Sequence, residues 1–248
     1  MTAWDALDEE IARWHDAGRN VEFWWRDDDA AEPDAPLERL LTLAARSGMP
    51  LAVAAIPARL SSDAAAMIRN CAGAVVVQHG YAHANHAGPD RPKSEYPKTR
   101  GLAERARDMS DGRKTLAALF AERFLPVFVP PWNRMAEDGM ILLSASGLIG
   151  LSRHKPRRSA TLAGGVRQSN VHVDIVDWQA GRRFLGEDRA LGLIRGHLEA
   201  RRAGSADPAE PTGILGHHRV QDAGAWDFLA RLFERHRDRF SPAARVFA

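Results

Sequence analysis

Two histidines four residues apart follow an apolar run in the stretch Val75 to His86, which reads VVVQHGYAHANH. Valine-rich runs form buried strands, so His79 stands where such a strand would end. His83 would face the same side if the chain turned helically after the strand. Imidazole nitrogens are common ligands of zinc and other divalent metals. A polar loop that is merely rich in histidine is the alternative, and we favour it for the third histidine, His86.

Three consecutive aspartates occur in the stretch Arg26 to Ala30 (RDDDA), again directly after an apolar run. Neighbouring carboxylates repel one another, and burying one without a partner is costly, so the run alone would indicate a solvated turn. A cation shared with His79 and His83 would remove that cost. One aspartate oxygen and two histidine nitrogens leave coordination positions open, which is typical of a catalytic metal site.

Short β-type runs alternate with longer helical patterns along the whole chain. The runs lie at 21–26, 51–56, 74–78, 126–131, 148–152, 171–176 and 213–218. About seven strands separated by helices are expected of parallel βαβ units. Nothing in the composition marks a boundary, so we predict one α/β domain over residues 1–248, built as a barrel or a related wound sheet.

Polar and aromatic residues follow several of these runs, and in parallel α/β folds the loops after the strands meet at one rim. The aspartates follow the first run and the histidines follow the third. The same rim would also receive Pro130, Trp132, Asn133 and Arg134 after the fourth run, Asp177 and Trp178 after the sixth, and His217 and His218 at the seventh. We therefore expect one site that combines carboxylates, imidazoles and aromatic rings.

The composition argues against several other classes of protein. The 34 Lys and Arg nearly balance the 32 Asp and Glu, and no basic stripe interleaved with aromatic residues indicates nucleic-acid binding. No apolar run approaches the roughly twenty residues of a membrane span. Cys71 is the single cysteine, so an intrachain disulfide is excluded. The first residues, MTAWDALDEEIARWHDAG, are acidic and unlike a secretory signal, and we expect a cytoplasmic protein.

The order of these residues resembles that of the polysaccharide deacetylases of the NodB-homology type, carbohydrate esterase family four. Five short motifs of that family are matched in order, as RDDDA at 26–30, the two histidines at 79–83, FVPPWNR at 128–134, DIVDW at 174–178 and LGH at 215–217. Each motif is weak alone, but five in order are specific. FVPPWN together with GILGHH resembles a divergent, cytosolic bacterial branch. The resemblance implies a distorted barrel of seven or eight βα units.

The resemblance also implies a role for individual residues. Asp28 would be the catalytic base and His217 the catalytic acid, with Asp177 as the charge partner of His217. A divalent metal would bind to Asp29, His79 and His83. Zinc is the preferred metal for such ligands, with cobalt, nickel and manganese as alternatives.

The third motif departs from the family pattern of Arg-x-Pro-x-Gly. Val129 stands at the arginine position, which in the family orients the base, and Asn133 stands at the glycine position. Arg26 is a candidate substitute because residues two apart on a strand share a face with one another, and Arg134 is a second candidate. The residues expected to contact substrate are Pro130, Trp132, Asn133 and Trp178.

The expected function is the metal-dependent removal of an acetyl group from an N-acetylated sugar or small oligosaccharide. Because Val129 replaces the arginine, a catalytically weak or inactive homologue that only binds metal and sugar is an alternative. A deacylase of another small amide is a further alternative. A metal-dependent phosphoesterase is less well supported, because no Gly-rich phosphate-binding loop is present.

Overall fold

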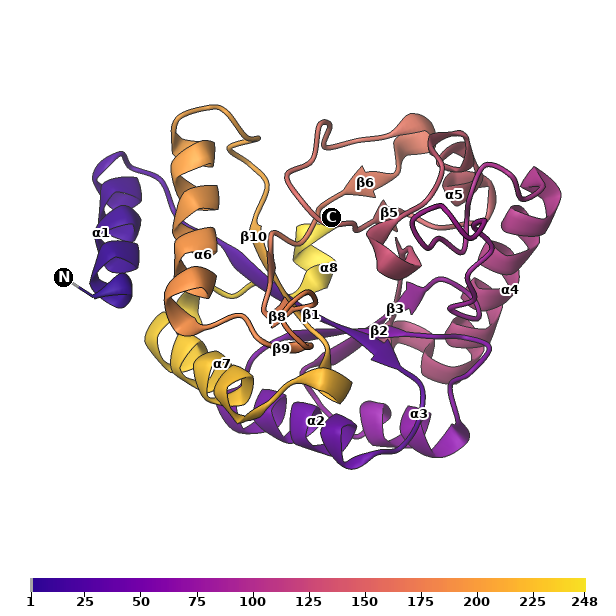
Figure 1. The fold of residues 1–248 in the computed structure, drawn as a ribbon, viewed down its shortest axis with the longest axis horizontal. Coiled ribbons are helices and arrows are strands. Elements are labelled where there is room, and N and C mark those ends of the chain that lie inside the picture. The colour runs from indigo at the N-terminus through magenta and orange to yellow at the C-terminus, as the bar shows by residue number, and fades with distance from the viewer. Residues whose placement is uncertain (1) are drawn as a thin grey trace.

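Eight parallel strands form one curled sheet in the computed structural model, which describes residues 2–248 (Figure 1). They lie in the order β6-β5-β4-β3-β2-β1-β10-β7. Their bounds are β1 Phe23–Ala30, β2 Leu51–Ala55, β3 Ala74–His79, β4 Phe124–Val129, β5 Gly150–Leu151, β6 Arg167–Gln168, β7 Val173–Asp174 and β10 Thr212–Gly216. β8 (Val176–Asp177) and β9 (Arg183–Phe184) form a separate antiparallel hairpin.

The predicted α/β class and the distorted barrel are confirmed. The additional strand, β6, lies in a basic segment without strand pattern and is two residues long, which is too short to give a periodic signal. One parallel bridge between His154 and Val171 links the two sides of the curl, within the described residues. The sheet is therefore a strongly curled half-barrel.

Helices cover the outer face of the sheet, and one short helix lies inside the curl (Figure 1). The outer helices are α1 Ala3–Asp16, α2 Ala35–Ser47, α3 Ser62–Arg69, α4 Leu102–Phe120, α5 Ile141–Ala145, α6 Glu187–Arg202 and α7 Ala223–His236. The inner one is α8, Ala243–Val246. Between residues 2 and 248, no helix combines the length and the apolar character that crossing a bilayer requires.

Successive side chains of β1 point alternately towards the outer helices and into the curl of the sheet. Trp25 packs with Phe233 among the residues that join the sheet to the outer helices. Trp24 faces the opposite way, into the curl, where it contacts Phe247 beside α8. Because successive side chains on a strand point to opposite faces, Arg26 and Asp28 also face the interior of the curl.

A cluster of buried polar side chains lies at the amino ends of β7 and β10. His172 and His197 stack face to face, with ring centroids 3.5 Å apart, and Glu210 lies 3.3 Å from His172 Nε2. Burial, followed by the positive charge of Arg201, lowers the pKa of His172 to about 3. Burial and the neighbouring His172 lower the pKa of His197 to about 3. Both rings are therefore neutral in the folded protein at neutral pH.

This cluster predicts a loss of stability in acid. The unfolded chain protonates both histidines near their ordinary pKa of about 6.5, whereas the folded chain does not, so the free energy of unfolding decreases as the pH falls from about 6.5 towards 3. Each histidine contributes up to about 1.4 kcal/mol per pH unit in that window. Urea unfolding at several pH values should give a shallower pH dependence for His172→Asn/His197→Asn than for the wild type. The exposed His15→Asn is the control, and equal slopes for all three proteins would contradict the prediction.

Candidate metal centre and catalytic residues

Asp29, His79 and His83 converge at the carboxyl ends of β1 and β3. The Asp29 Oδ1 atom lies 3.1 Å from His79 Nε2 and 3.3 Å from His83 Nε2. One ligand atom from each residue lies within 4.8 Å of those of the other two. The structure thus brings together the three residues for which the sequence predicts metal binding.

A bulge in β1 allows two adjacent aspartates to serve one site. The pairing with β2 shifts by one residue between Asp27 and Ala30, and Asp29 adopts a positive φ of 75°. In a regular strand, Asp28 and Asp29 would point to opposite faces. A bulge re-aims one side chain, so Asp29 reaches the histidines while Asp28 continues to face the curl.

The hydrogen bonds of His79 leave it suited to bind a metal. Its Nδ1 lies 3.1 Å from the Val129 carbonyl oxygen, which can only accept, so Nδ1 carries the proton. The Nε2 atom, on the Asp29 side, therefore has a free lone pair in the neutral ring. A backbone carbonyl that fixes the tautomer in this way is typical of metal-binding histidines.

The charges of the three residues also fit a cation. Burial opposes ionisation of Asp29, but the hydrogen bond and the charge of His79 hold its pKa well below the usual range. Burial and the nearby His79 lower the pKa of His83 to about 4, so His83 is neutral at pH 7. Burial opposes protonation of His79, but the Asp28 and Asp29 carboxylates raise its pKa, so a metal would displace a proton from this ring. The ionised Asp29 carboxylate and the neutral His83 imidazole are donors that zinc accepts.

A second group with metal-ligand chemistry, His172, His197 and Glu210, does not fit a metal. The Gly213 backbone N–H donates to His172 Nδ1, so the proton of the neutral ring is on Nε2, the atom that a metal would need. The two rings are also nearly parallel, at 17°, so one ion could not lie in the plane of both. This cluster is a structural feature of the amino end of the sheet.

Arg26 holds Asp28 through a two-pronged ion pair. Its Nε donates to Asp28 Oδ1 at 2.8 Å and its second terminal nitrogen donates to Oδ2 at 3.0 Å. The guanidinium also donates to Ser152 Oγ and to Asn133 Oδ1. Arg26 is fully buried and Asp28 is 1% exposed, so each charge depends on the other. Of the two candidates named from the sequence, Arg26 is the one that contacts the carboxylate.

Arg134, the other candidate, is exposed, and within residues 2–248 it makes no ion pair with Asp28. It follows two residues in the left-handed region, Trp132 and Asn133, each with a φ of 55°. Asparagine tolerates this conformation better than most residues, which explains why it can occupy the expected glycine position. The resulting turn directs the Asn133 side chain inward to Arg26 and sends Arg134 outward.

The carboxylate beside His217 is Asp174, and not Asp177 as expected from the sequence. Asp174 Oδ1 lies 3.7 Å from His217 Nδ1, and the carboxylate accepts from the Val176 N–H and from Trp178 Nε1. Asp177 instead accepts from two backbone amides of the hairpin turn and pairs with Arg189 at 2.8 Å. The reason is that β7 ends at Asp174, two residues before the end of the expected strand, so Asp174 and not Asp177 lies at the strand end.

The expected substrate-contacting residues divide into two kinds. Trp132 lies against His83, with ring centroids 4.4 Å apart, and Trp178 packs edge-on against His217 at 4.7 Å. Trp178 is 45% exposed and Trp132 is half-buried, so one aromatic ring lies beside each of these histidines, and the Trp178 ring is the more open to a ligand. Asn133 is engaged by Arg26, and Pro130 is buried inside its loop.

The remaining histidines of the motifs lie outside the cluster of Asp29, His79 and His83. His86 is exposed, and its backbone N–H donates to Ser94. His218 is buried and its Nδ1 bonds to Asp27 Oδ1, on the opposite face of β1 from Asp28. The first aspartate of the run thus connects β1 to the segment that carries His217.

The sequence analysis missed Glu95, a fully buried carboxylate from the loop between β3 and α4. It accepts hydrogen bonds from the backbone amides of Tyr81, Ala82 and Ala84. Burial raises the pKa of Glu95, while these backbone bonds oppose the rise. No sequence pattern distinguishes it from the polar residues around it, because its partners are backbone groups.

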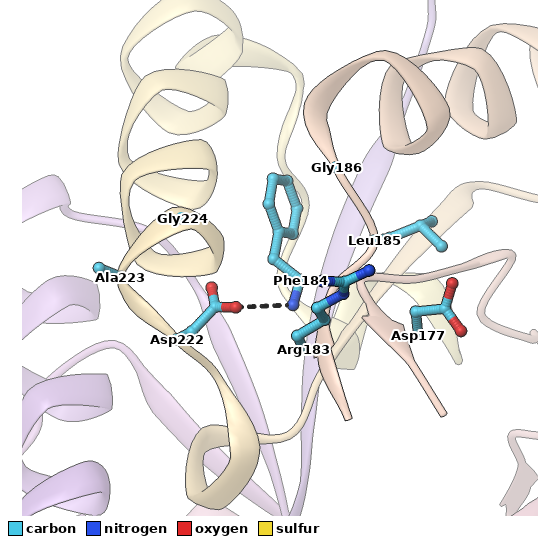
Figure 2. Close-up of a pocket in the computed structure, with 8 residues that line it drawn as sticks. All are labelled: Asp177, Arg183, Phe184, Leu185, Gly186, Asp222, Ala223 and Gly224. Carbon is cyan, nitrogen blue, oxygen red and sulfur yellow. Dashed lines mark hydrogen bonds between the residues drawn. The ribbon is translucent and has the colours of Figure 1, made fainter. Parts of the chain in front are cut away.

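A shallow surface pocket of about 530 Å³ lies next to this site, between the β8–β9 hairpin and the start of α7. Figure 2 shows Asp177 and Arg183 on one wall and Asp222, bonded to the Phe184 amide, on the other. None of the three clustered ligands lines it. Because Trp178 follows Asp177 directly, the pocket extends the surface on the His217 side.

The buried ion pair leads to a stability prediction. Arg26→Met leaves the Asp28 carboxylate buried without a partner and should lower the free energy of unfolding by about 3–5 kcal/mol. Adding Asp28→Asn should recover part of this loss, because the remaining side chain is neutral. Arg134→Met, at an exposed position, should change the value by no more than about 0.5 kcal/mol. Urea unfolding measures all three, and equal effects of the two arginine substitutions would refute the assigned pairing.

Comparison with known proteins identifies a fold and no sequence relative. No protein-family profile matches this sequence, and a search of curated proteins finds no match. A structure from Mycobacterium smegmatis, described provisionally as a polysaccharide deacetylase, aligns with a TM-score of 0.64 at 16% identity, over 92% of this chain and 88% of that chain. A family 4 carbohydrate esterase from Streptomyces lividans, solved with acetate, aligns at 0.56 and 15% identity over 90% of each chain.

A third structure with this architecture is a family 4 pseudoenzyme from Bacillus anthracis, with a TM-score of 0.59 and 12% identity over 92% of this chain and 66% of that chain. The architecture is thus shared by esterases and by a protein described as a pseudoenzyme. At these identities the likeness concerns the fold alone. The chain has the fold of the family 4 carbohydrate esterases, the NodB-like polysaccharide deacetylases.

Proposed function

We propose that this protein is a metal-dependent deacetylase that releases acetate from an N-acetylated sugar or short oligosaccharide. The observation that carries the proposal is the grouping of three metal-ligand side chains, one buried carboxylate and one histidine at the same end of the sheet. The charge of Asp28 contributes to the raised pKa of His79, and the charge of His217 adds to that of His79 in lowering the pKa of Asp29. Asp28 and His217 therefore both lie close to the metal-ligand cluster.

Asp29, His79 and His83 would hold the divalent metal, with zinc preferred and cobalt, nickel or manganese as alternatives. When bound, such a metal polarises a carbonyl oxygen and lowers the pKa of water. The neutral His83 can bind without prior loss of a proton, whereas His79 would lose the proton on Nε2 while the Val129 carbonyl keeps the Nδ1 proton in place.

Asp28 would act as the general base. The fork from Arg26 fixes both carboxylate oxygens, so the base is oriented without an arginine in the third motif. It would take a proton from the attacking water as the new carbon–oxygen bond forms. This pairing weighs against the inactive homologue, because the loss at Val129 is compensated from within β1.

His217 would act as the general acid. Asp174 faces its Nδ1, and Trp178 and the Val176 amide hold that carboxylate in place. The ring would then present Nε2 to the leaving nitrogen and donate a proton as the carbon–nitrogen bond breaks. The products are acetate and a free amine.

The two tryptophans beside the histidines support a sugar as the substrate. Trp132 and Trp178 flank the histidines on opposite sides of the site. Aromatic rings offer flat apolar surfaces that suit a sugar face or an acetyl methyl group. The Streptomyces lividans esterase of the same fold was solved with acetate, the acyl product that this proposal requires.

Acetate release from a panel of N-acetylated sugars tests the proposal. The wild type loaded with Zn²⁺ should release acetate, and Asp28→Asn should lower kcat by about 10²–10⁴-fold while it still binds metal. Asp29→Ala/His79→Ala should lose the metal. Metal binding that survives this double substitution, or a Zn²⁺-loaded wild type inactive on every sugar of the panel, would refute the proposal.

Asp174 and Asp177 provide a matched pair for testing the acid. Asp174→Asn removes the charge that faces His217 and should lower kcat by about 10- to 100-fold, less than loss of the acid itself. Asp177→Asn removes a carboxylate whose partners are the hairpin amides and Arg189, so kcat should stay near the wild-type value. Steady-state kinetics measures both, and a larger loss in Asp177→Asn would reverse the assignment.

A further inference from the structure

The turn that carries His83 is built on one buried carboxylate. We call residues 79–84 the histidine turn, since they connect His79 at the end of β3 to His83. Tyr81 and Ala82 donate their backbone N–H groups to Glu95 at 3.1 and 2.7 Å, and Ala84 donates at 3.5 Å. Residues 80–84 of the turn lie outside regular secondary structure, so the amides of Tyr81, Ala82 and Ala84 have no partners from a helix or a sheet.

The turn and the carboxylate also fit each other sterically. Gly80 has a φ of +58°, and a Cβ atom at this position would lie 2.0 Å from Glu95 Oε2 and 2.6 Å from Pro131 Cγ. The carboxylate therefore occupies the space that a side chain at residue 80 would need. His83 itself has a positive φ of 55°, a conformation that the surrounding contacts must maintain.

We propose that Glu95 is a positioning residue for the metal centre. It holds the histidine turn so that His83 faces Asp29, as His79 does. Within residues 2–248 Glu95 makes no hydrogen bond or ion pair with the three ligand side chains, and it acts through the backbone between two of them. The inference rests on the metal site of the proposed function and does not depend on the reaction. Residues that support metal ligands in this way typically change metal affinity by about 10- to 100-fold when they are substituted.

The chain contains a matched control for this carboxylate. Glu210 is also fully buried and also accepts from two backbone amides, those of Arg157 and Asn170, at 2.8 and 2.9 Å. It lies before the amino end of β10, whereas His217 follows the carboxyl end of that strand. Loss of Glu210 removes the same kind of interaction without touching the histidine turn.

The test is a Zn²⁺ titration of the full chain against a chromophoric chelator. Glu95→Ala should raise the Kd for Zn²⁺ by about 10- to 100-fold, and Glu95→Gln by less, because the amide keeps one oxygen for Ala82. Glu210→Gln should leave the Kd unchanged. With Co²⁺, the visible absorption spectrum should differ from that of the wild type in the Glu95 variants and not in Glu210→Gln, since the spectrum reports ligand geometry.

The outcomes distinguish a failure of this inference from a failure of the proposed function. A wild type that binds no Zn²⁺ overturns this inference and the proposed function together. A wild-type Kd and Co²⁺ spectrum in Glu95→Gln overturn this inference, and they do so even if Glu95→Ala fails to fold. A weakened Kd in the Glu95 variants supports it, and if the wild type then releases no acetate, only the proposed deacetylase activity is lost.

Discussion

Two neighbouring carboxylates on one strand cannot ordinarily face the same site, and the bulge in β1 removes this constraint. The shift in pairing between Asp27 and Ala30, with Asp29 at positive φ, separates the directions of three consecutive aspartates. Asp27 faces His218 on one side of the strand, Asp28 faces Arg26 in the curl, and Asp29 reaches the two histidines. Each carboxylate thereby obtains its own partner, and the repulsion expected within the run is offset.

The strands around β1 place the other groups of the site next to the β1 bulge. β10 pairs with β1 in register, Asp27 opposite Gly216, which brings His217 next to the aspartates. On the other side of β1, β2 separates it from β3, whose end carries His79. β4 supplies the Val129 carbonyl that orients His79 and the turn that delivers Asn133. With β7, which ends at Asp174 beside His217, five strands contribute to the site, and the curl of the sheet brings their ends together.

The sequence was sufficient to predict the α/β barrel and the convergence of Asp29, His79 and His83, because alternating apolar runs and strand-end residues are local patterns. It was insufficient for Asp174, since β7 is two residues long and its end is set by pairing with β10. Glu95 also escaped prediction, because its partners are backbone amides and leave no trace in residue types. Arg26 was one of two candidates, and only the left-handed turn at Trp132 and Asn133 decides between them.

The position of Arg26 on the same strand as Asp28 affects which substitutions the site can tolerate. Arg26 and Asp28 belong to the same strand, two residues apart, so the proposed base and the arginine that pairs with it form a unit that one segment of chain encodes. The loop after β4 contributes only Asn133 to that unit. An exposed residue of this loop such as Arg134 can therefore change without disturbing the Arg26–Asp28 pair, whereas Trp132 and Pro131 are tied to the histidine turn through His83 and Gly80.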